Sequence, residues 1–556
     1  MTGHVAERVS TARQLADRFW EQLLELDPIL GTQVGDERFD DRLPDPSAAG
    51  VARRASVYRG VLDEMGGIDR AALGVEDRTA LDVAEAIARS GLDAITYRLD
   101  RFRAVSHLFG PAQLLAELGS LQRADTAERA ERYLARLAAV PTYLAAVSEV
   151  AREGAASGST APALVVDRAI GQVERLLAGD PATSPGMSPF PAGMAETEAG
   201  RQAAAALMEE AIWPAYAGYL AALRAYRPAA RETIGAGDLP DGPALYASQI
   251  LAHTTLPLTA EEVHATGLAE LAAIQEEERE IAGRLGHPDA ASALAAHTAA
   301  GGNVAGTRAE LLARAERQVA QAWDAASGWF GRLPASPCQV SPVEAFREED
   351  MPPAFYIPAT GDGSRPGIYY INLGHLDAVP LHMLATISYH EANPGHHFQI
   401  SIEQEFTERG PLRRFGGIQA GTAFAEGWGL YCERLAGEMG LYESDYERLG
   451  MLGAQAWRAV RLIVDSGIHA LGWDRQRAVD LCTSVGLARP VAEVEVDRYI
   501  SWPGQALSYK IGQIEIQSLR AEAARRPGFS VRAFHDRLLE LGTLPLAALR
   551  REMSSV

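Results

Sequence analysis

The sequence has few cysteines, no long apolar run and fewer basic than acidic residues. Its three cysteines, Cys338, Cys432 and Cys482, lie far apart and form no CxxC pair. This argues against both a disulfide framework and a zinc knuckle. No stretch approaches the length of a membrane span, and the N-terminal residues 1–20 contain no uninterrupted apolar segment typical of a signal peptide. We therefore expect a cytoplasmic protein with reduced thiols and no membrane partner.

The charge balance narrows the range of partners. Lys and Arg number 52 against 73 Asp and Glu, which gives a net charge of -21. Such acidity disfavours nucleic acid as the main partner, and it says nothing of oligomeric state. With 556 residues, 47% of them hydrophobic, the chain can bury a large core as one big domain or as two lobes.

Helical patterns dominate the first two-thirds of the chain. Ala12, Leu15, Phe19 and Leu23 recur at helical spacing. Two capping boxes, Thr259-x-x-Glu262 and Thr307-x-x-Glu310, predict the starts of two further helices. No fixed-period repeat is present, which argues against a short-repeat solenoid. The pattern predicts a mainly α fold, organised as a single large helical domain over residues 1–556.

The character of the sequence changes near Pro337. Residues 354–357 and 367–372 are rich in β-forming side chains and flank a turn of Gly, Asp, Ser, Arg and Pro. This predicts a small β-hairpin over residues 354–372, and the edge of such a hairpin can bind an extended peptide. The motifs that carry chemistry follow it, so we place the catalytic half at about residues 337–556.

A histidine-rich stretch at residues 390–397, HEANPGHH, points to zinc. Zinc binds imidazole nitrogen and carboxylate oxygen, and a catalytic zinc leaves one position for water. In the HExxH zinc peptidases two His residues bind the metal and the Glu between them is the general base, which is the role expected of Glu391. Here the fourth position after His390 is Pro394, which breaks a helix predicted over residues 381–392. The break could bring His396 or His397 to the metal.

Further candidates lie downstream. Glu426 and Glu433 are seven residues apart, on one face of a helix. Glu426 is the candidate third ligand, and Glu433 could orient a ligand His from behind. Tyr509 and His469 are candidates to hydrogen-bond the oxyanion of a tetrahedral intermediate. His469 also ends a stripe with Arg461 and Asp465, which is either an internal ion network or the wall of a cleft.

Three segments, HEANPGHHFQ at 390–399, AFAEGWGLYCE at 423–433 and WPGQALSYKIG at 502–512, resemble the bacterial family called domain of unknown function 885. Segments 35–45 and 253–270 resemble it too, so the likeness spans nearly the whole chain. That family is similar to the gluzincin metallopeptidases of the angiotensin-converting-enzyme, thimet-oligopeptidase and carboxypeptidase Taq groups. The resemblance implies a large helical fold with a deep cleft between two lobes. Because those relatives carry Gly before their second His, it favours His396 over His397.

These lines converge on a zinc-dependent hydrolase of short peptides or small peptide-like amides. Zinc would be held by His390, His396 and Glu426, and Glu391 would deprotonate a bound water for attack on the amide carbonyl. One alternative is a biosynthetic hydrolase or lyase acting on a small-metabolite amide. Another is a catalytically silent zinc-binding scaffold, which Glu391 argues against because a structural zinc needs no general base.

Overall fold

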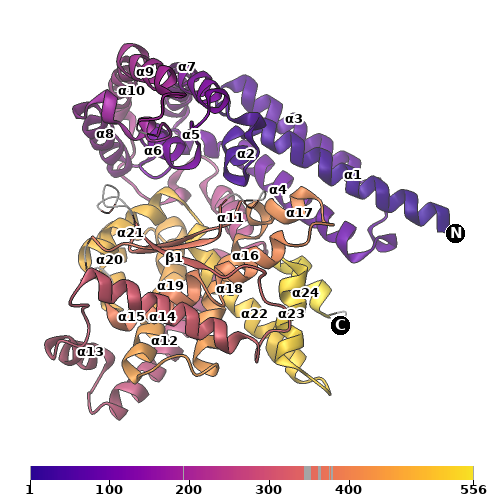
Figure 1. The fold of residues 1–556 in the computed structure, drawn as a ribbon, viewed down its shortest axis with the longest axis vertical. Helices are drawn as coiled ribbons and strands as arrows, with labels where there is room; N and C mark the ends of the chain where they lie inside the picture. The colour runs from indigo at the N-terminus through magenta and orange to yellow at the C-terminus, as the bar shows by residue number, and fades with distance from the viewer. Residues whose placement is uncertain are drawn as a thin grey trace.

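The computed structural model describes residues 2–191, 193–343, 348, 352–360, 363, 365–374, 376 and 380–554, with side chains from Thr11 onward. Helices follow one another along almost the whole of this chain (Figure 1), which confirms the predicted mainly α fold. The first ten are α1 (Thr2–Leu26), α2 (Pro28–Val34), α3 (Ala48–Met65), α4 (Val75–Thr96), α5 (Leu99–Arg103), α6 (Pro111–Leu121), α7 (Ala127–Ser157), α8 (Ala163–Ala178), α9 (Glu198–Leu207) and α10 (Trp213–Tyr226).

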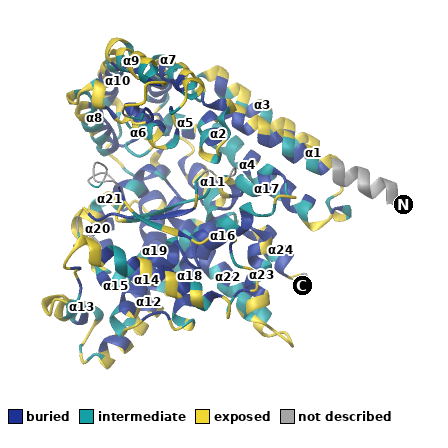
Figure 2. Ribbon diagram, viewed as in Figure 1, coloured by how far each residue is buried: buried dark blue, intermediate teal, exposed yellow. Residues whose placement is uncertain are grey.

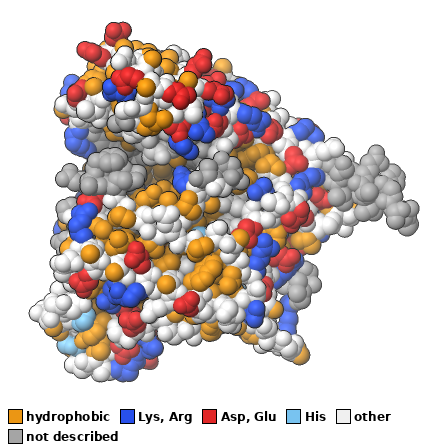
Figure 3. Space-filling view, viewed as in Figure 1, with side chains coloured by type: hydrophobic (Ala, Val, Ile, Leu, Met, Phe, Trp, Pro, Cys, Tyr) orange, Lys and Arg blue, Asp and Glu red, His pale blue; other side chains and the backbone are white. Residues whose placement is uncertain are grey.

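The remaining helices form the larger part of the molecule, below the N-terminal helices in Figure 1. They are α11 (Gly242–Thr254), α12 (Ala260–Arg284), α13 (Ala290–Ala299), α14 (Arg308–Ala326), α15 (Leu381–Glu391), α16 (His396–Gln404), α17 (Pro411–Phe415), α18 (Gly417–Glu438), α19 (Asp445–Ala470), α20 (Arg475–Ser484), α21 (Arg489–Ser501), α22 (Ser508–Ala524), α23 (Val531–Leu541) and α24 (Leu546–Ser554). In the space-filling view a recess separates the two parts (Figure 3).

Local sequence signals set several helix starts. Thr259 and Glu262 exchange both hydrogen bonds of the predicted capping box at the start of α12. At the start of α14 the Thr307 side chain accepts from the Glu310 amide, but the Glu310 carboxylate accepts from the Gly306 amide instead of from Thr307. Residues 180–191 contain two short 3-10 turns, Pro181–Thr183 and Pro185–Met187, each starting at a proline.

Burial is greatest around α18 and α19 (Figure 2). From Ala423 to Ala436, nearly every residue of α18 is buried except Glu426 and Arg434. α18 also packs very closely on α22, because Gly427 and Gly512 face each other and a Cβ on either would collide with the opposite backbone. This close approach positions the start of α22 beside Glu426.

A three-stranded sheet accompanies the helices. β2 (Ala354–Ile357) pairs antiparallel with β3 (Ile368–Ile371), which confirms the predicted hairpin strands, although its turn lies partly outside the described residues. An unpredicted strand, β1 (Gln339–Pro342), pairs parallel with β3 and makes β3 the central strand.

Of the helices in the described residues, only α7 is long and apolar enough to cross a membrane by length and composition. Core helices of globular proteins share this length and composition, and α7 contributes Tyr133, Leu137 and Val140 to the buried core.

Candidate metal centre

A sharp reversal of the chain separates the first two candidate ligands. α15 ends at Glu391 and α16 begins at His396, so the two histidines lie on different helices. The Asn393–Pro394 peptide between them is cis, and Gly395 lies so close to the His390 carbonyl that a Cβ would collide with it. The turn is held from α18: the Trp428 indole donates to the Pro394 carbonyl at 3.0 Å. The predicted helix break therefore exists, and it returns His396 to the side of His390.

Three ligand atoms converge at this reversal. The Nε2 atoms of His390 and His396 each lie 3.6 Å from Oε2 of Glu426. One ligand atom from each of the three residues lies within 4.8 Å of the other two. Ligands at about 2.0–2.2 Å from a tetrahedral zinc are roughly 3.3–3.6 Å apart. The spacing and the donor set of two imidazoles and one carboxylate thus fit a zinc ion with an open fourth position.

A chain of buried hydrogen-bonding groups holds the His390 ring through Nδ1, whereas Nε2 lies near Glu426. Its Nδ1 lies 2.9 Å from Oε1 of Glu433, the residue expected to orient a ligand. Gln455 donates to the other oxygen of Glu433 at 3.0 Å, and Lys510 in turn donates to Gln455 at 3.2 Å. Lys510 is the only lysine in the sequence, and it also pairs with Glu270 at 3.0 Å. Such partners fix the ring orientation of a metal-binding His.

The ligand groups are electrostatically coupled. Burial lowers the pKa of His390, but hydrogen bonds to Glu426 and Glu433 outweigh that effect and raise the pKa to about 9. For Glu426 burial opposes ionisation, yet the two histidines hold its pKa well below the usual range. Both shifts reflect the attraction between the imidazoles and the Glu426 carboxylate, and a divalent cation bound between them would take the place of the shared proton.

Glu391 directly follows His390 and lies beside the sheet. Its side chain is partly exposed, and it has no hydrogen-bond or ion-pair partner among the described residues. Its charge adds to burial in raising the pKa of the Cys338 thiol to about 12, so the carboxylate lies near Cys338. Its charge also contributes, after the hydrogen bonds to Glu426 and Glu433, to raising the pKa of His390, so the carboxylate lies near the candidate ligands as well.

The structure distinguishes His396 from His397 as candidates for the second ligand. Both ring nitrogens of His397 are engaged, Nδ1 with the Tyr356 hydroxyl at 3.0 Å and Nε2 with the Ser336 carbonyl at 2.9 Å. The geometry thus favours His396 over its neighbour as the second ligand.

His469 is not at the cluster and has no N–H to spare. It accepts from the Ala236 amide at 3.0 Å through Nδ1, and Nε2 donates to the Tyr499 carbonyl at 3.0 Å. The oxyanion role expected of His469 does not fit this ring. Tyr509, near the start of α22, is better placed, because it lies near the Glu426 carboxylate. Burial makes the largest contribution to raising the pKa of Tyr509, and the charge of Glu426 raises it further.

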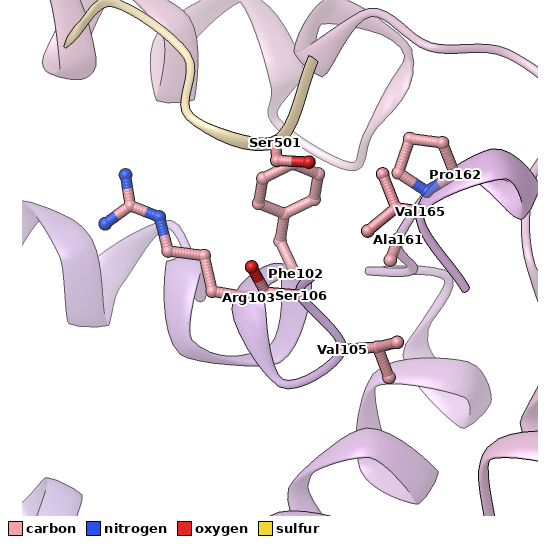
Figure 4. Close-up of a pocket in the computed structure, with 8 residues that line it drawn as sticks. All are labelled: Phe102, Arg103, Val105, Ser106, Ala161, Pro162, Val165 and Ser501. Atoms are coloured by element: carbon pink, nitrogen blue, oxygen red, sulfur yellow. The ribbon is translucent and has the colours of Figure 1, made fainter. Parts of the chain in front are cut away.

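The polar stripe on α19 is mainly an internal network. Asp465 accepts from the Tyr246 hydroxyl at 2.7 Å, and Arg461 donates to the Tyr499 hydroxyl at 3.0 Å. The small pocket drawn in Figure 4 is a different feature, lined by Phe102, Arg103, Val105, Ser106, Ala161, Pro162, Val165 and Ser501. It shares no residue with the metal cluster.

Comparison with known proteins gives a family and two similar structures. A family model described as "Bacterial protein of unknown function (DUF885)" matches residues 28–553. A crystal structure from Colwellia psychrerythraea is 26% identical, covers 99% of this chain and 98% of its own, and superposes with a TM-score of 0.90. A second solved structure, from Shewanella oneidensis, is 19% identical, covers 98% of this chain and 99% of its own, and has a TM-score of 0.75, which shows the fold alone. No curated protein matches.

Both solved structures are described as a "putative lipoprotein". This finding overturns the expectation of a cytoplasmic protein, because lipoproteins are exported or anchored to a membrane. The expectation was based on the absence of an apolar N-terminal segment, and composition within the folded part of a chain carries no address.

Proposed function

The chain belongs to the bacterial family of unknown function DUF885, and we propose that it is a zinc-dependent hydrolase cleaving amide bonds of short peptides or small peptide-like molecules. The observation that carries the proposal is the convergence of His390, His396 and Glu426 at zinc-ligand spacing, with Glu391 directly after the first ligand. We extend the proposal to a likeness in mechanism to the gluzincin metallopeptidases, whose motif the segment 390–397 resembles.

A zinc ion in this site would lower the pKa of its water and polarise a substrate carbonyl. The protein's own groups have separate tasks. Glu433 holds the His390 ring through Nδ1, so that Nε2 faces the ligand cluster. Glu391 accepts a proton and passes it to the leaving nitrogen. The Tyr509 hydroxyl donates a hydrogen bond to the substrate oxygen that gains charge.

The descriptions of the two structural neighbours lead us to propose an exported or membrane-anchored setting for this chain as well. Its substrates would then be peptides or amides found outside the cytoplasm.

The Glu391→Gln substitution tests the proposal, because glutamine keeps the size of the side chain but cannot take a proton. The variant should fold, retain zinc and lose at least about a hundredfold in hydrolysis, within the usual effect of a general base. The exposed Glu316 on α14 provides the control, since Glu316→Gln removes the same charge far from the ligands in sequence. Equal turnover by wild type and Glu391→Gln would contradict the mechanism. A wild type that carries full zinc yet cleaves nothing in a broad peptide library would indicate the silent scaffold instead.

A further inference from the structure

Next to Tyr509, α19 and α21 place three arginines around one carboxylate. Arg461 and Arg498 both donate to Oε2 of Glu495, at 3.0 and 3.1 Å. Arg458, one turn before Arg461 on α19, has no hydrogen-bond or ion-pair partner among the described residues. The two arginines hold the pKa of Glu495 at about 2 against the opposing effect of burial, so this carboxylate is charged. Two positive charges therefore contact one negative charge, and a third lies near it.

Several donors of these guanidinium groups are buried without a partner. They are Nε of Arg458, Nε of Arg498 and one terminal nitrogen of Arg461, whose side chain is only 5% exposed. Buried charged donors are costly unless they are hydrogen-bonded, so native structures satisfy nearly all of them. An anion bound here would satisfy these unpaired donors.

Aromatic rings surround the cluster. The guanidinium carbons of Arg458 and Arg461 each lie 4.4 Å from the centre of the Trp457 ring. Arg461 also lies 4.4 Å from the centre of the Tyr509 ring. These faces orient the guanidinium planes.

Tyr509 connects the cluster to the metal site. Its ring contacts Arg461, and its hydroxyl is near enough to the Glu426 carboxylate for that charge to raise its pKa, after burial. The arginines thus lie one side chain away from a metal ligand. An extended amino-acid residue spans about 3.3–3.6 Å, so a substrate with its amide at the metal can reach them within one or two residues.

We propose that Arg458, Arg461 and Arg498 bind a free carboxylate at the end of the substrate, so that hydrolysis is directed to amide bonds one or two residues from a carboxyl terminus. Guanidinium groups match carboxylates in geometry and form strong charge-assisted hydrogen bonds with them. This inference rests on the proposed hydrolase function and deepens it. It names the substrate class as short peptides with a free carboxyl terminus, or acylated amino acids.

The test is a calorimetric binding measurement that needs no turnover. Zinc-loaded Glu391→Gln protein is titrated with N-acetyl-dialanine bearing a free carboxyl terminus, and with the same compound as the carboxamide. The free acid should bind about ten- to a hundredfold tighter, the contribution expected of hydrogen bonds to a charged group. Equal affinity for acid and amide would overturn the inference.

Adding Arg458→Gln to this protein should remove most of the preference for the acid, and Arg458→Lys should keep part of it. The control is Arg489→Gln on α21, a half-exposed arginine paired with Asp480, which should leave the preference intact. A third ligand, N-acetyl-Ala-Asp-carboxamide, separates the two sources of a carboxylate. If it binds as tightly as the free acid, the cluster recognises an acidic side chain and the carboxy-terminal assignment is wrong. Because binding is measured without hydrolysis, failure here leaves the zinc hydrolase proposal untouched.

Discussion

Gly429 on α18 offers a sharp test of the metal site, because its backbone faces the ring of His390. A Cβ at this position would lie 2.7 Å from Cε1, 2.8 Å from Nε2 and 3.0 Å from Nδ1 of that ring. Carbon atoms in ordinary contact are about 3.5–4.0 Å apart. The Gly429→Ala substitution therefore forces the imidazole to retreat by about 0.8 Å.

A zinc ligand tolerates much less displacement than that. Metal–ligand distances in real sites stay within about 0.2 Å of their ideal values. The ring cannot simply slide, since Glu433 holds its Nδ1 at 2.9 Å. Disturbing the support of a ligand His commonly costs about ten- to a hundredfold in metal affinity, and we expect at least that loss. Helix propensity itself favours alanine by about 0.8–1 kcal/mol, so α18 should remain intact.

The assay is zinc content after dialysis against a chelator series, with circular dichroism as a check on folding. Gly437→Ala in the same helix is the control, because its Cβ would meet the Tyr442 ring at an ordinary 3.7 Å. It should bind zinc as the wild type does. A Gly429→Ala protein with unchanged zinc affinity would refute the reasoning.

Two other predictions concern Tyr509 and Asp465. Tyr509→Phe should lower kcat by about a hundredfold, the usual cost of one oxyanion donor, while zinc content stays normal; unchanged kcat would leave Tyr509 as packing. Burial raises the pKa of Asp465 to about 7, against hydrogen bonds from Tyr246 and Gly504. The folded state thus holds its proton more tightly than the unfolded state, and this stability is full below about pH 4 and lost as pH rises to about 7. In urea unfolding, the free energy of unfolding of the wild type should fall by up to about 4 kcal/mol relative to that of Asp465→Asn across this pH window. A difference between the two proteins that stays constant with pH would contradict the assignment.

Much of the fold follows from local patterns. Helical spacing predicted α1 through Ala12, Leu15 and Phe19, which are all buried, and the Thr259 capping box is present as expected. These features depend on neighbouring residues alone. β1 could not be found in this way, because its parallel pairing with β3 joins segments separated by about thirty residues and has no local turn signal.

The same distinction between local patterns and contacts between distant segments applies to the candidate site. Residue types and spacing indicated His390, Glu391, Glu426 and Glu433, because their chemistry is rare in that combination. Spacing alone left His396 and His397 open, and only the turn at Pro394 decides which ring faces Glu426.

Other features of the site depend on contacts between distant segments. His469 has the right chemistry for an oxyanion donor, but its two ring nitrogens bond to Ala236 and Tyr499. The role of Gly429 arises from α18 passing close to α15, and no sequence pattern marks it. The same holds for Arg458, whose lack of a partner is visible only when the surrounding helices are in place.

The most direct test of the central claim is the zinc stoichiometry and affinity of the purified full chain. We predict about one tightly bound zinc per chain in the wild type and in His397→Ala. We also predict a sharp loss in each of His390→Ala, His396→Ala and Glu426→Ala. A wild type that binds no zinc, or ligand variants that all keep it with wild-type affinity, would contradict the account.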